Sequence, residues 1–251
     1  MKVVGIVPCR LGSSRLPGKP LADICGRPMM WHVYRQATRA VSLDAVYIAS
    51  ADAPILKAAQ DLGLDSLKTS GRHATGSDCV AECAGKVDAE VYVNVQGDEP
   101  MIEPEAIDRV ATAVLGANGA QVLASNAYAP IRDASEALDV NVVKAVTTFD
   151  GTALAYSRQP IPYPKQQAVT YKRQLGLYAF RRIGLEIFAS HRPGPVERSE
   201  GIEMLRFLEY GHKVLMVEVG GNAMPVDTQS DLARVREIMA GSYGRVSGVK
   251  D

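Results

Sequence analysis

The chain has 251 residues, and its 28 basic and 28 acidic side chains give a formal net charge of zero at pH 7. This length suits one large α/β domain, or a domain with a subsidiary lobe. The neutral balance gives no reason to expect a nucleic-acid groove or binding to an anionic membrane surface, so the expected partner is a small molecule. No apolar run approaches the roughly 20 residues that span a bilayer, and the N-terminus does not resemble a cleavable signal, which predicts a cytoplasmic protein.

The first predicted strand covers residues 3–7 and continues into a loop that combines flexible backbone with fixed cations. The loop carries Gly12, Ser13, Ser14 and Gly18 together with Arg10, Arg15 and Lys19. Glycines let backbone N–H groups approach an anion, and the cations neutralise several negative charges at once. Ligands of open α/β sheets bind beyond the carboxyl ends of strands, so this loop predicts a polyphosphate site, with a solvated surface turn as the alternative. Neither the dinucleotide fingerprint nor the P-loop pattern is met.

The next predicted elements alternate between helix and strand. They are a helix at 29–40, a strand at 45–50, a helix at 52–62 and a short strand at 65–69. A helix ending near Ala84 then begins close to Thr75, Gly76 and Ser77, whose small donors could receive a nucleobase or a phosphate. The equally weighted alternative is a plain N-cap made by Thr75 or Ser77.

A buried strand is predicted at 90–95, and two acids, Asp98 and Glu99, follow its carboxyl end. Magnesium prefers carboxylate oxygens and keeps several waters, so one strand-end acid together with phosphate oxygens makes a plausible site. Asp98 is nearest to the strand and is the predicted ligand, whereas an acidic β-turn is the alternative.

The four cysteines, Cys9, Cys25, Cys79 and Cys83, lack paired CxxC spacing, which predicts neither a zinc site nor a disulfide framework. Cys79 and Cys83 are four residues apart and could face one side of a helix. Two buried thiols explain that spacing better than a metal site does. We therefore interpret all four as packing residues.

The rest of the chain predicts a change in architecture. The expected elements are a helix at 104–116, a strand at 121–127, a short helix at 134–138, strands at 140–148 and 154–156, a helix at 197–210, a strand at 213–219, a helix at 230–239 and a loose tail at 242–251. Alternation up to about Tyr128 predicts a mostly parallel, doubly wound sheet, and the crowded strands after Asn141 predict a smaller antiparallel extension. We expect a single domain over 1–251, with a core of about 1–130 and 212–240 and a lobe of about 131–211.

Two features of the predicted lobe allow more than one interpretation. A proline-rich arm at 156–164 could wall a pocket or meet a second subunit. Glu197, Glu200 and Glu203 repeat at the i, i+3 spacing of one helix face, which usually indicates a solvated stripe.

Six blocks of the sequence, taken together, resemble a known family. They are RLGSSRLPGKPL (10–21), HATGSD (73–78), NVQGDEPMI (94–102), YSRQPIP (156–162), RQLGLYAFR (173–181) and VDTQSDL (226–232). Each is similar to a block of the cytidylyltransferases that activate 3-deoxy-manno-octulosonate (Kdo), also called CMP-Kdo synthetases, and the order along the chain is the same. The combination of RLPGKPL with NVQGDEP is highly specific to this family.

The resemblance implies a sugar-nucleotidyltransferase α/β fold, a homodimer and Mg²⁺-dependent use of CTP. The implied reaction transfers CMP from CTP to the anomeric hydroxyl of a Kdo-like 3-deoxy-2-ulosonic acid and releases pyrophosphate, which activates a sugar for lipopolysaccharide or capsule. The resemblance also assigns roles to three groups of residues: Arg10, Leu11, Gly12, Ser13, Arg15, Lys19, Thr75, Ser77 and Gln96 hold the nucleotide; Gln96, Arg158, Gln174, Tyr178, Glu203 and Met204 surround the sugar acid; and Asp98 and Asp227 bind the metal. Arg10, Lys19 and Asp98 are the expected catalytic residues. Without the resemblance, Asp227 could as well be a loop acid or a cap.

Four positions depart from the family's usual pattern. Gln174 replaces a histidine, Phe180 a tyrosine, Met204 a glutamine, and Cys79 an arginine that commonly follows the GTE or GTD element. The first three lie in blocks expected near the sugar, where lost polar donors penalise a substrate that needs them. The acid could therefore be an amino-modified Kdo, a nonulosonic acid or a phosphonate. A glycosyltransferase and a non-catalytic nucleotide-binding subunit are the more distant alternatives.

Overall fold

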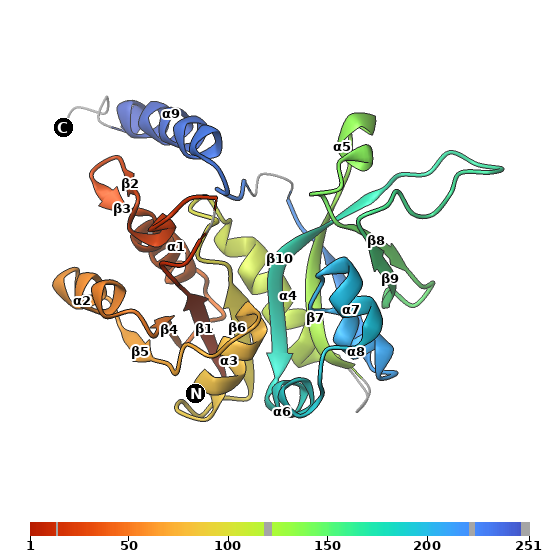
Figure 1. Cartoon of the computed structure of the whole chain (residues 1–251), viewed down its shortest axis with the longest axis horizontal. Coiled ribbons are helices and arrows are strands. Elements are labelled where there is room, and N and C mark those ends of the chain that lie inside the picture. Colours follow the sequence, from red (N-terminus) through yellow and green to blue (C-terminus); the bar gives the residue numbers. More distant parts are fainter. Residues whose placement is uncertain (14, 118–121, 221–223, 247–251) are drawn as a thin grey trace.

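The computed structural model describes residues 1–13, 15–117, 122–220 and 224–246, and only the backbone of 242–246. Within this part of the chain, one nine-stranded sheet has the order β11-β7-β10-β6-β1-β4-β5, and β8 and β9 extend it from β10 (Figure 1). The strands of the sheet are β1 (Val3–Pro8), β4 (Ala45–Ser50), β5 (Ser66–Lys68), β6 (Val91–Val95), β7 (Val122–Pro130), β8 (Lys144–Thr147), β9 (Ala153–Ser157), β10 (Lys172–Arg181) and β11 (Lys213–Glu218). A separate small hairpin consists of β2 (Asp23–Ile24) and β3 (Arg27–Pro28).

The sheet is mostly parallel, as the sequence predicts. Strand β1 pairs in parallel with β4 and β6, β4 pairs with β5, and β7 pairs with β11. The antiparallel extension is present as β8 and β9. Strand β10, which the sequence analysis did not assign, is antiparallel to both neighbours and lies in the middle of the sheet, between β6 and β7. It therefore carries residues of the predicted lobe into the central sheet. The division of the chain into core and lobe remains a prediction.

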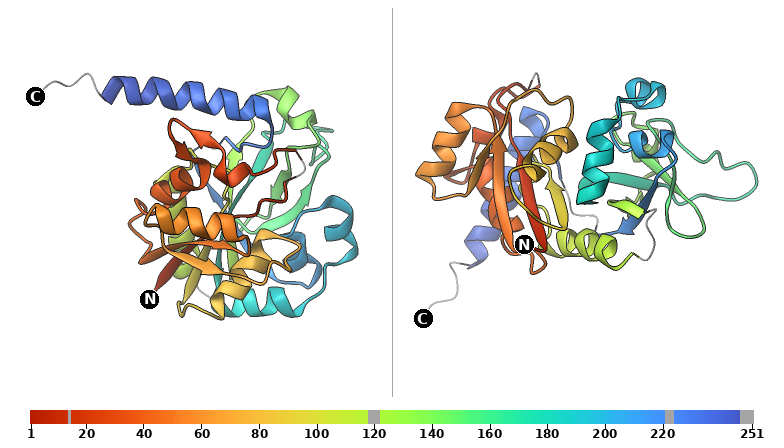
Figure 2. Two further views of the ribbon diagram at one scale, coloured as in Figure 1. Left: turned by 60° about the vertical axis from the view of Figure 1, so that its left-hand side comes forward. Right: turned by 90° about the horizontal axis from the view of Figure 1, so that it is seen from below.

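Helices cover both faces of the sheet (Figure 2). They are α1 (Met29–Ala37), α2 (Ala53–Asp61), α3 (Gly76–Ala84), α4 (Pro104–Gly116), α5 (Ala134–Leu138), α6 (Arg182–Ser190), α7 (Pro195–Glu200), α8 (Leu205–Glu209) and α9 (Gln229–Val246), with a 3-10 turn η1 at Lys19–Leu21. One core cluster joins α1, α2 and α4 to one face, and a second joins α3, α6 and α8 to the other. A third, smaller cluster packs Leu232 and Val235 of α9 against Leu16, Ile24 of β2 and Met29 of α1.

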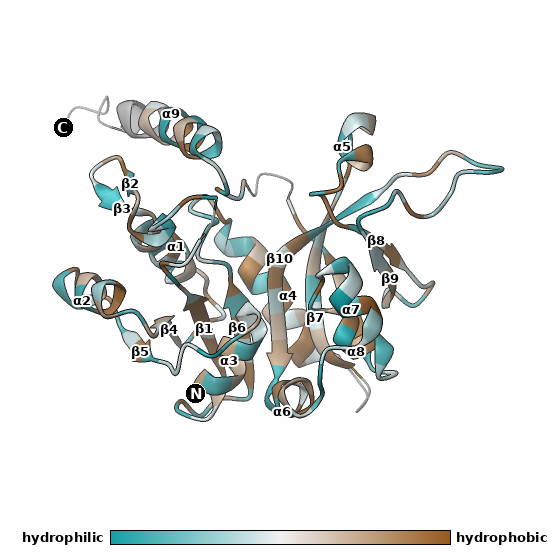
Figure 3. Cartoon of the chain, viewed as in Figure 1, coloured by the Kyte–Doolittle hydropathy of each residue, from teal (hydrophilic) through white to brown (hydrophobic). Residues whose placement is uncertain are grey.

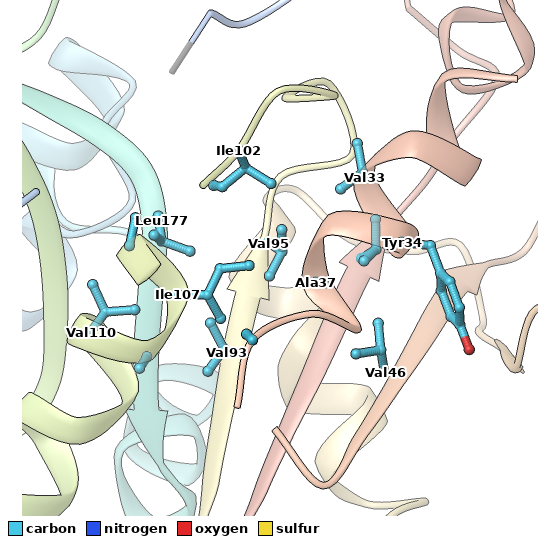
Figure 4. Close-up of a cluster of buried hydrophobic side chains, with 14 of the residues drawn as sticks. Val33, Tyr34, Ala37, Val46, Val93, Val95, Ile102, Ile107, Val110 and Leu177 are labelled. Carbon is cyan, nitrogen blue, oxygen red and sulfur yellow. The ribbon is translucent and has the colours of Figure 1, made fainter. Parts of the chain in front are cut away.

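Alternation along the strands builds the two cores. Val93 and Val95 of β6 pack with Ile107 of α4 on one face (Figure 4), whereas Tyr92, the residue before Val93, belongs to the cluster on the other face. Successive side chains of a strand point to opposite faces, so a strand that is buried on both faces is apolar at most of its positions. Figure 3 shows this as hydrophobic strands in the interior beneath more hydrophilic helices. No helix in the described part of the chain is long and apolar enough to cross a membrane.

Several predicted elements differ from the structure, and the predicted strand at 140–148 is shortened to β8 (Lys144–Thr147). The predicted helix at 197–210 is broken into α7 and α8, because Gly201 takes a left-handed conformation (φ +66°) that ends α7. The last helix extends to Val246, so the tail prediction is wrong for 242–246. Ser14, Gln121 and 247–251 lie outside the described residues. Helix α6 was not predicted at all.

The β8–β9 hairpin and the proline-rich arm between β9 and β10 project from one side of the molecule (Figure 1). Apolar side chains on this side are exposed to solvent, among them Phe149, Leu154 (63% exposed) and Tyr163. The N-terminus lies below the sheet, far from this projection (Figure 1).

Candidate active site

A first chamber of about 560 Å³ opens beyond the carboxyl ends of β1, β4 and β6. This is the edge where open α/β sheets bind ligands, because the loops that leave parallel strands diverge there. The predicted nucleotide residues that line it are Arg10, Gly12, Ser13, Arg15, Lys19, Thr75 and Gln96. The structure thus gathers most of the cationic loop and the start of α3 around one cavity.

A second chamber of about 660 Å³ lies beside the first, between β10 and the α7–α8 region. Its wall includes the predicted sugar-acid residues Gln96, Arg158, Gln174, Tyr178 and Glu203. The two chambers share Ala74, Thr75, Gly76, Gln96, Asp98 and Asp227. Two ligands bound in the two chambers would therefore meet at the predicted metal-binding acids.

The carboxylates of Asp98 and Asp227 converge on a single ammonium group. Lys19 Nζ is 2.7 Å from Asp98 Oδ2 and 3.0 Å from Asp227 Oδ1, and Arg15 Nη2 is also 3.0 Å from Asp227 Oδ1. Burial acts to lower the pKa of Lys19, but the two carboxylates outweigh it and raise that pKa. Lys19 therefore keeps its positive charge at the junction of the chambers.

The donor set at this junction fits a hard divalent cation. Two carboxylates offer oxygen ligands, Asp98 after β6 and Asp227 just before α9, and their shared lysine shows that both already face a positive charge. No group of three or more histidine, cysteine or acidic side chains with metal-binding geometry occurs among the described residues. Magnesium suits such a partial site, because it keeps waters and takes phosphate oxygens from a nucleotide.

Side chains of the protein already accept hydrogen bonds from backbone N–H groups at the start of α3. Thr75 forms a capping box, in which its hydroxyl accepts from the Asp78 backbone N–H and the Asp78 carboxylate accepts from the Thr75 backbone N–H. The Ser77 backbone N–H donates to Glu203 Oε2 (3.0 Å). The N-cap alternative is therefore observed, and a carboxylate already takes a donor that an anion would need.

Three predicted site residues lie outside both chambers. The Ser77 side chain is fully buried beside Asn94, and the Met204 side chain is fully buried in the core that packs α8. Leu11 packs against the opposite core, and its backbone N–H donates to Asp52 Oδ2. Met204 therefore does not contact the second chamber directly, because α8 turns this position inward.

The acidic stripe of α7 and its neighbour is structural, so its interpretation as a solvated face is wrong. Glu197 is buried and receives two hydrogen bonds from Arg206, at 2.6 and 2.8 Å. Glu200 accepts from the Ser157 hydroxyl and the Arg158 backbone N–H, and the Glu200 carbonyl accepts from Arg158 Nε. With Glu203 capping α3, these acids hold the walls of the second chamber together.

Two glycines let the shared residue Gln96 sit where it does. A Cβ added at Gly176 would lie 2.7 Å from Gln96 Cγ, and one added at Gly97 would lie 2.6 Å from the Pro8 carbonyl oxygen. Both distances are shorter than real Cβ contacts, so side chains there would displace Gln96 or its loop. Gly176 lines the second chamber and Gly97 lines the first, so both glycines are part of the site.

Sequence reasoning missed Glu99 and Arg173 as lining residues of the second chamber. Burial, with a smaller contribution from nearby Asp98, raises the pKa of the Glu99 carboxyl to about 8. The adjacency of Glu99 to Asp98 at a strand end was the available signal. Cys79 lines the first chamber, and Cys9, Cys79 and Cys83 are buried as expected, whereas Cys25 is exposed.

Comparisons with known proteins agree on one family. A family model described as cytidylyltransferase matches residues 4–214. The 3-deoxy-manno-octulosonate cytidylyltransferase of Anaeromyxobacter dehalogenans (strain 2CP-1 / ATCC BAA-258) is 42% identical over 242 residues, covering 95% of this chain and 98% of that protein. The protein of the same name from Solibacter usitatus is 39% identical and covers 96% of each. A solved structure of CMP:2-keto-3-deoxy-manno-octonic acid synthetase complexed with CTP is similar with a TM-score of 0.91 and 35% identity, covering 96% of this chain and all of that one.

Proposed function

The chain belongs to the cytidylyltransferase family, and from this premise we propose that it transfers CMP from CTP to the anomeric hydroxyl of a Kdo-like 3-deoxy-2-ulosonic acid. Pyrophosphate is the leaving group. The observation that carries the proposal is the meeting of two chambers at Asp98, Asp227 and Gln96. One chamber has the cations that a triphosphate needs, and the other has the polar wall that a sugar acid needs.

The first chamber binds and orients the triphosphate in this proposal. Arg10, Arg15 and Lys19 offset the negative charge that the phosphates carry and that grows on the leaving pyrophosphate. No covalent enzyme intermediate is required, because the sugar hydroxyl attacks the α-phosphorus directly. Catalysis is then mainly alignment and electrostatic stabilisation, as in phosphoryl transfer generally.

Asp98 and Asp227 hold Mg²⁺ in the proposal. When bound, the metal supplies positive charge that stabilises the phosphates and favours the ionised form of the attacking hydroxyl. The two carboxylates keep the cation at the junction of the chambers, and Lys19, which contacts both, is expected to turn toward phosphate oxygens.

The second chamber positions the sugar acid. Arg158 is anchored by two backbone carbonyls, because its Nε donates to Glu200 and its Nη1 donates to Val140. A guanidinium held in this way is preorganised for a carboxylate. Tyr178, whose pKa is raised well above its usual value by burial, keeps its hydroxyl proton and remains a hydrogen-bond donor.

The direct test measures pyrophosphate release with CTP, Mg²⁺ and a panel of ulosonic acids. We expect turnover with at least one 3-deoxy-2-ulosonic acid and no comparable turnover when UTP or ATP replaces CTP. Absence of turnover with every acid and nucleotide tried contradicts the proposal. CTP binding without turnover in the presence of Mg²⁺ instead favours the non-catalytic alternative. We place the reaction in the cytoplasm, where CTP is made.

We also propose that the protein is a homodimer that uses the projecting side of the molecule. Leu138 (71% exposed), Phe149, Leu154 and Tyr163 are exposed apolar side chains on α5, the β8–β9 hairpin and the arm. Apolar side chains gathered on one side of a molecule commonly mark an interface. A partner there would cover them next to the second chamber.

The double variant Phe149→Ser, Leu154→Ser is expected to shift the protein from dimer to monomer, because it removes the largest apolar contacts of the hairpin. Light scattering after size-exclusion chromatography measures the mass. The matched control is Val41→Ser, an exposed apolar residue in the loop before β4 (91% exposed), which should leave the mass unchanged. A wild-type protein that is monomeric at micromolar concentration contradicts the dimer.

A further inference from the structure

Asn126 of β7 is a fully buried amide whose orientation is dictated by its neighbours. Its Nδ2 lies 2.9 Å from the Leu175 carbonyl oxygen, 3.2 Å from that of Leu177 and 3.1 Å from that of Ala127. Carbonyl oxygens can only accept, so the donor end of the amide must face them. The acceptor end, Oδ1, is thereby turned toward Gln174.

The orientation of the Asn126 amide also fixes the orientation of the Gln174 amide in β10. Gln174 Nε2 donates to Asn126 Oδ1 at 3.0 Å, so the amide nitrogen of Gln174 must point at Asn126. The other end of the amide, Oε1, is left for the second chamber, which Gln174 lines. No described residue donates a hydrogen bond to this oxygen.

We infer that Gln174 is a specificity-determining residue that accepts a hydrogen bond from a donor group of the sugar acid, and that Asn126 is its positioning residue. The inference rests on the proposed function. The donor is a hydroxyl or a protonated amine, since both carry hydrogens that an amide oxygen can accept. A group that only accepts, such as an ether, a ketone or a carboxylate, is disfavoured at this position.

The identity of residue 174 matters because of this fixed polarity. A histidine at the same place could present either a donor or an acceptor, depending on its tautomer. A glutamine could do the same if its amide were free to flip. Asn126 removes that freedom, since a flipped Gln174 would set two acceptor oxygens against each other.

A second buried polar group lines the same chamber. Glu99 lines the second chamber and is 4% exposed, and its Oε2 is buried with no hydrogen-bond partner among the described residues. A buried polar atom without a partner is unfavourable until a ligand or water satisfies it. The chamber wall thus holds a second polar group in addition to Gln174, which favours a polar substrate over an apolar one.

The first test is Gln174→Met, which keeps the length of the side chain and removes the acceptor. The KM for the sugar acid should rise about three- to ten-fold, the loss expected for one neutral hydrogen bond, while the KM for CTP stays unchanged. Gln60→Met, the same change at an exposed position on α2, is the matched control. Thermal melts with CTP check that both variants are folded.

The second test uses sugar acids altered at one hydroxyl at a time. We expect one hydroxyl position at which the deoxy and O-methyl analogues are poorer substrates than the parent sugar acid for the wild type. For Gln174→Met, the same analogues should be no worse than the parent. An amino analogue at that position distinguishes the donors: a lower KM than the parent identifies a protonated amine, and a higher KM identifies a hydroxyl. Asn126→Leu keeps the approximate shape of the side chain and removes the oxygen that accepts from Gln174 Nε2. It should raise the KM for the sugar acid, with no further rise on adding Gln174→Met. If Asn126→Leu does not fold, the Gln174→Met results still decide.

Two results overturn the inference: an equal rise in both KM values for Gln174→Met, or no analogue whose penalty disappears in that variant. Either can occur with a fully active wild-type enzyme, so the failure is separate from failure of the proposed function. If the wild type turns over no ulosonic acid, the proposed function fails first.

Discussion

Asp227→Asn is expected to lower kcat for pyrophosphate release by at least about 100-fold, because it removes charge at the point where both chambers meet. Asp227 contacts Lys19 and Arg15 at 3.0 Å each and lines both cavities. Asparagine keeps the shape of the side chain but weakens binding of a divalent cation. The apparent Mg²⁺ concentration needed for half-maximal rate should rise in the same variant.

The control for this change is Asp61→Asn, which alters an exposed acid on α2 whose carboxylate pairs with Lys57. It removes the same charge far from the chambers and should leave kcat within about two-fold, as is usual for surface substitutions. Asp98→Asn should behave like Asp227→Asn, since Asp98 is the other partner of Lys19. Full activity of either site variant, with an unchanged Mg²⁺ dependence, contradicts the assignment of the metal-binding acids.

Arg206→Met is expected to destabilise the folded protein by about 3–5 kcal/mol, because it leaves a buried carboxylate without its partner. Arg206 is 3% exposed and Glu197 is 5% exposed, and the two share two hydrogen bonds. Arg206 Nη1 also donates to Asp78 Oδ1 at 3.1 Å, and its guanidinium carbon lies 3.8 Å from the Phe188 ring centroid. Burial acts to lower the pKa of Arg206, but Glu197 and Asp78 outweigh it, so the arginine is charged at neutral pH.

Denaturant unfolding followed by circular dichroism measures this effect. The double variant Arg206→Met, Glu197→Leu should recover much of the lost free energy of unfolding, since it removes both buried charges together. Lys57→Met breaks an exposed ion pair and should change the free energy of unfolding very little. A similar stability for Arg206→Met and Lys57→Met would show that the buried pair does not hold α7, α8 and α3 together.

Hydrophobic periodicity predicted the N-terminal part of the fold, in which strands and helices alternate regularly along the chain. Strand β4 and helix α4 match their predicted bounds, because each is an apolar segment with a clear break on both sides. Strand β10 was not assigned, because its partners β6 and β7 are distant in sequence and no local signal shows that it enters the middle of the sheet. The prediction of one helix at 197–210 did not treat Gly201 as a helix end, although this glycine splits that helix in the structure.

Some residues of the candidate site could also be predicted from local sequence, whereas others could not. The cationic loop and Asp98 follow from their position after strands, and the structure gathers them around the first chamber. Asp227 has no comparable local signal and came only from the resemblance, because its meeting with Asp98 is a tertiary contact. Helical spacing placed Glu197, Glu200 and Glu203 on one helix face, but Gly201 ends that helix before Glu203. Spacing also could not show that the three acids contact arginines and a helix terminus inside the protein.

The most direct test of the central claim is to identify the product formed from CTP and a 3-deoxy-2-ulosonic acid in the presence of Mg²⁺. The two-chamber arrangement predicts one CMP-sugar per pyrophosphate, with the phosphorus bonded through oxygen to the anomeric carbon, which ¹³C–³¹P coupling detects. Release of phosphate without a CMP-sugar, or attachment of CMP to another hydroxyl, would contradict it.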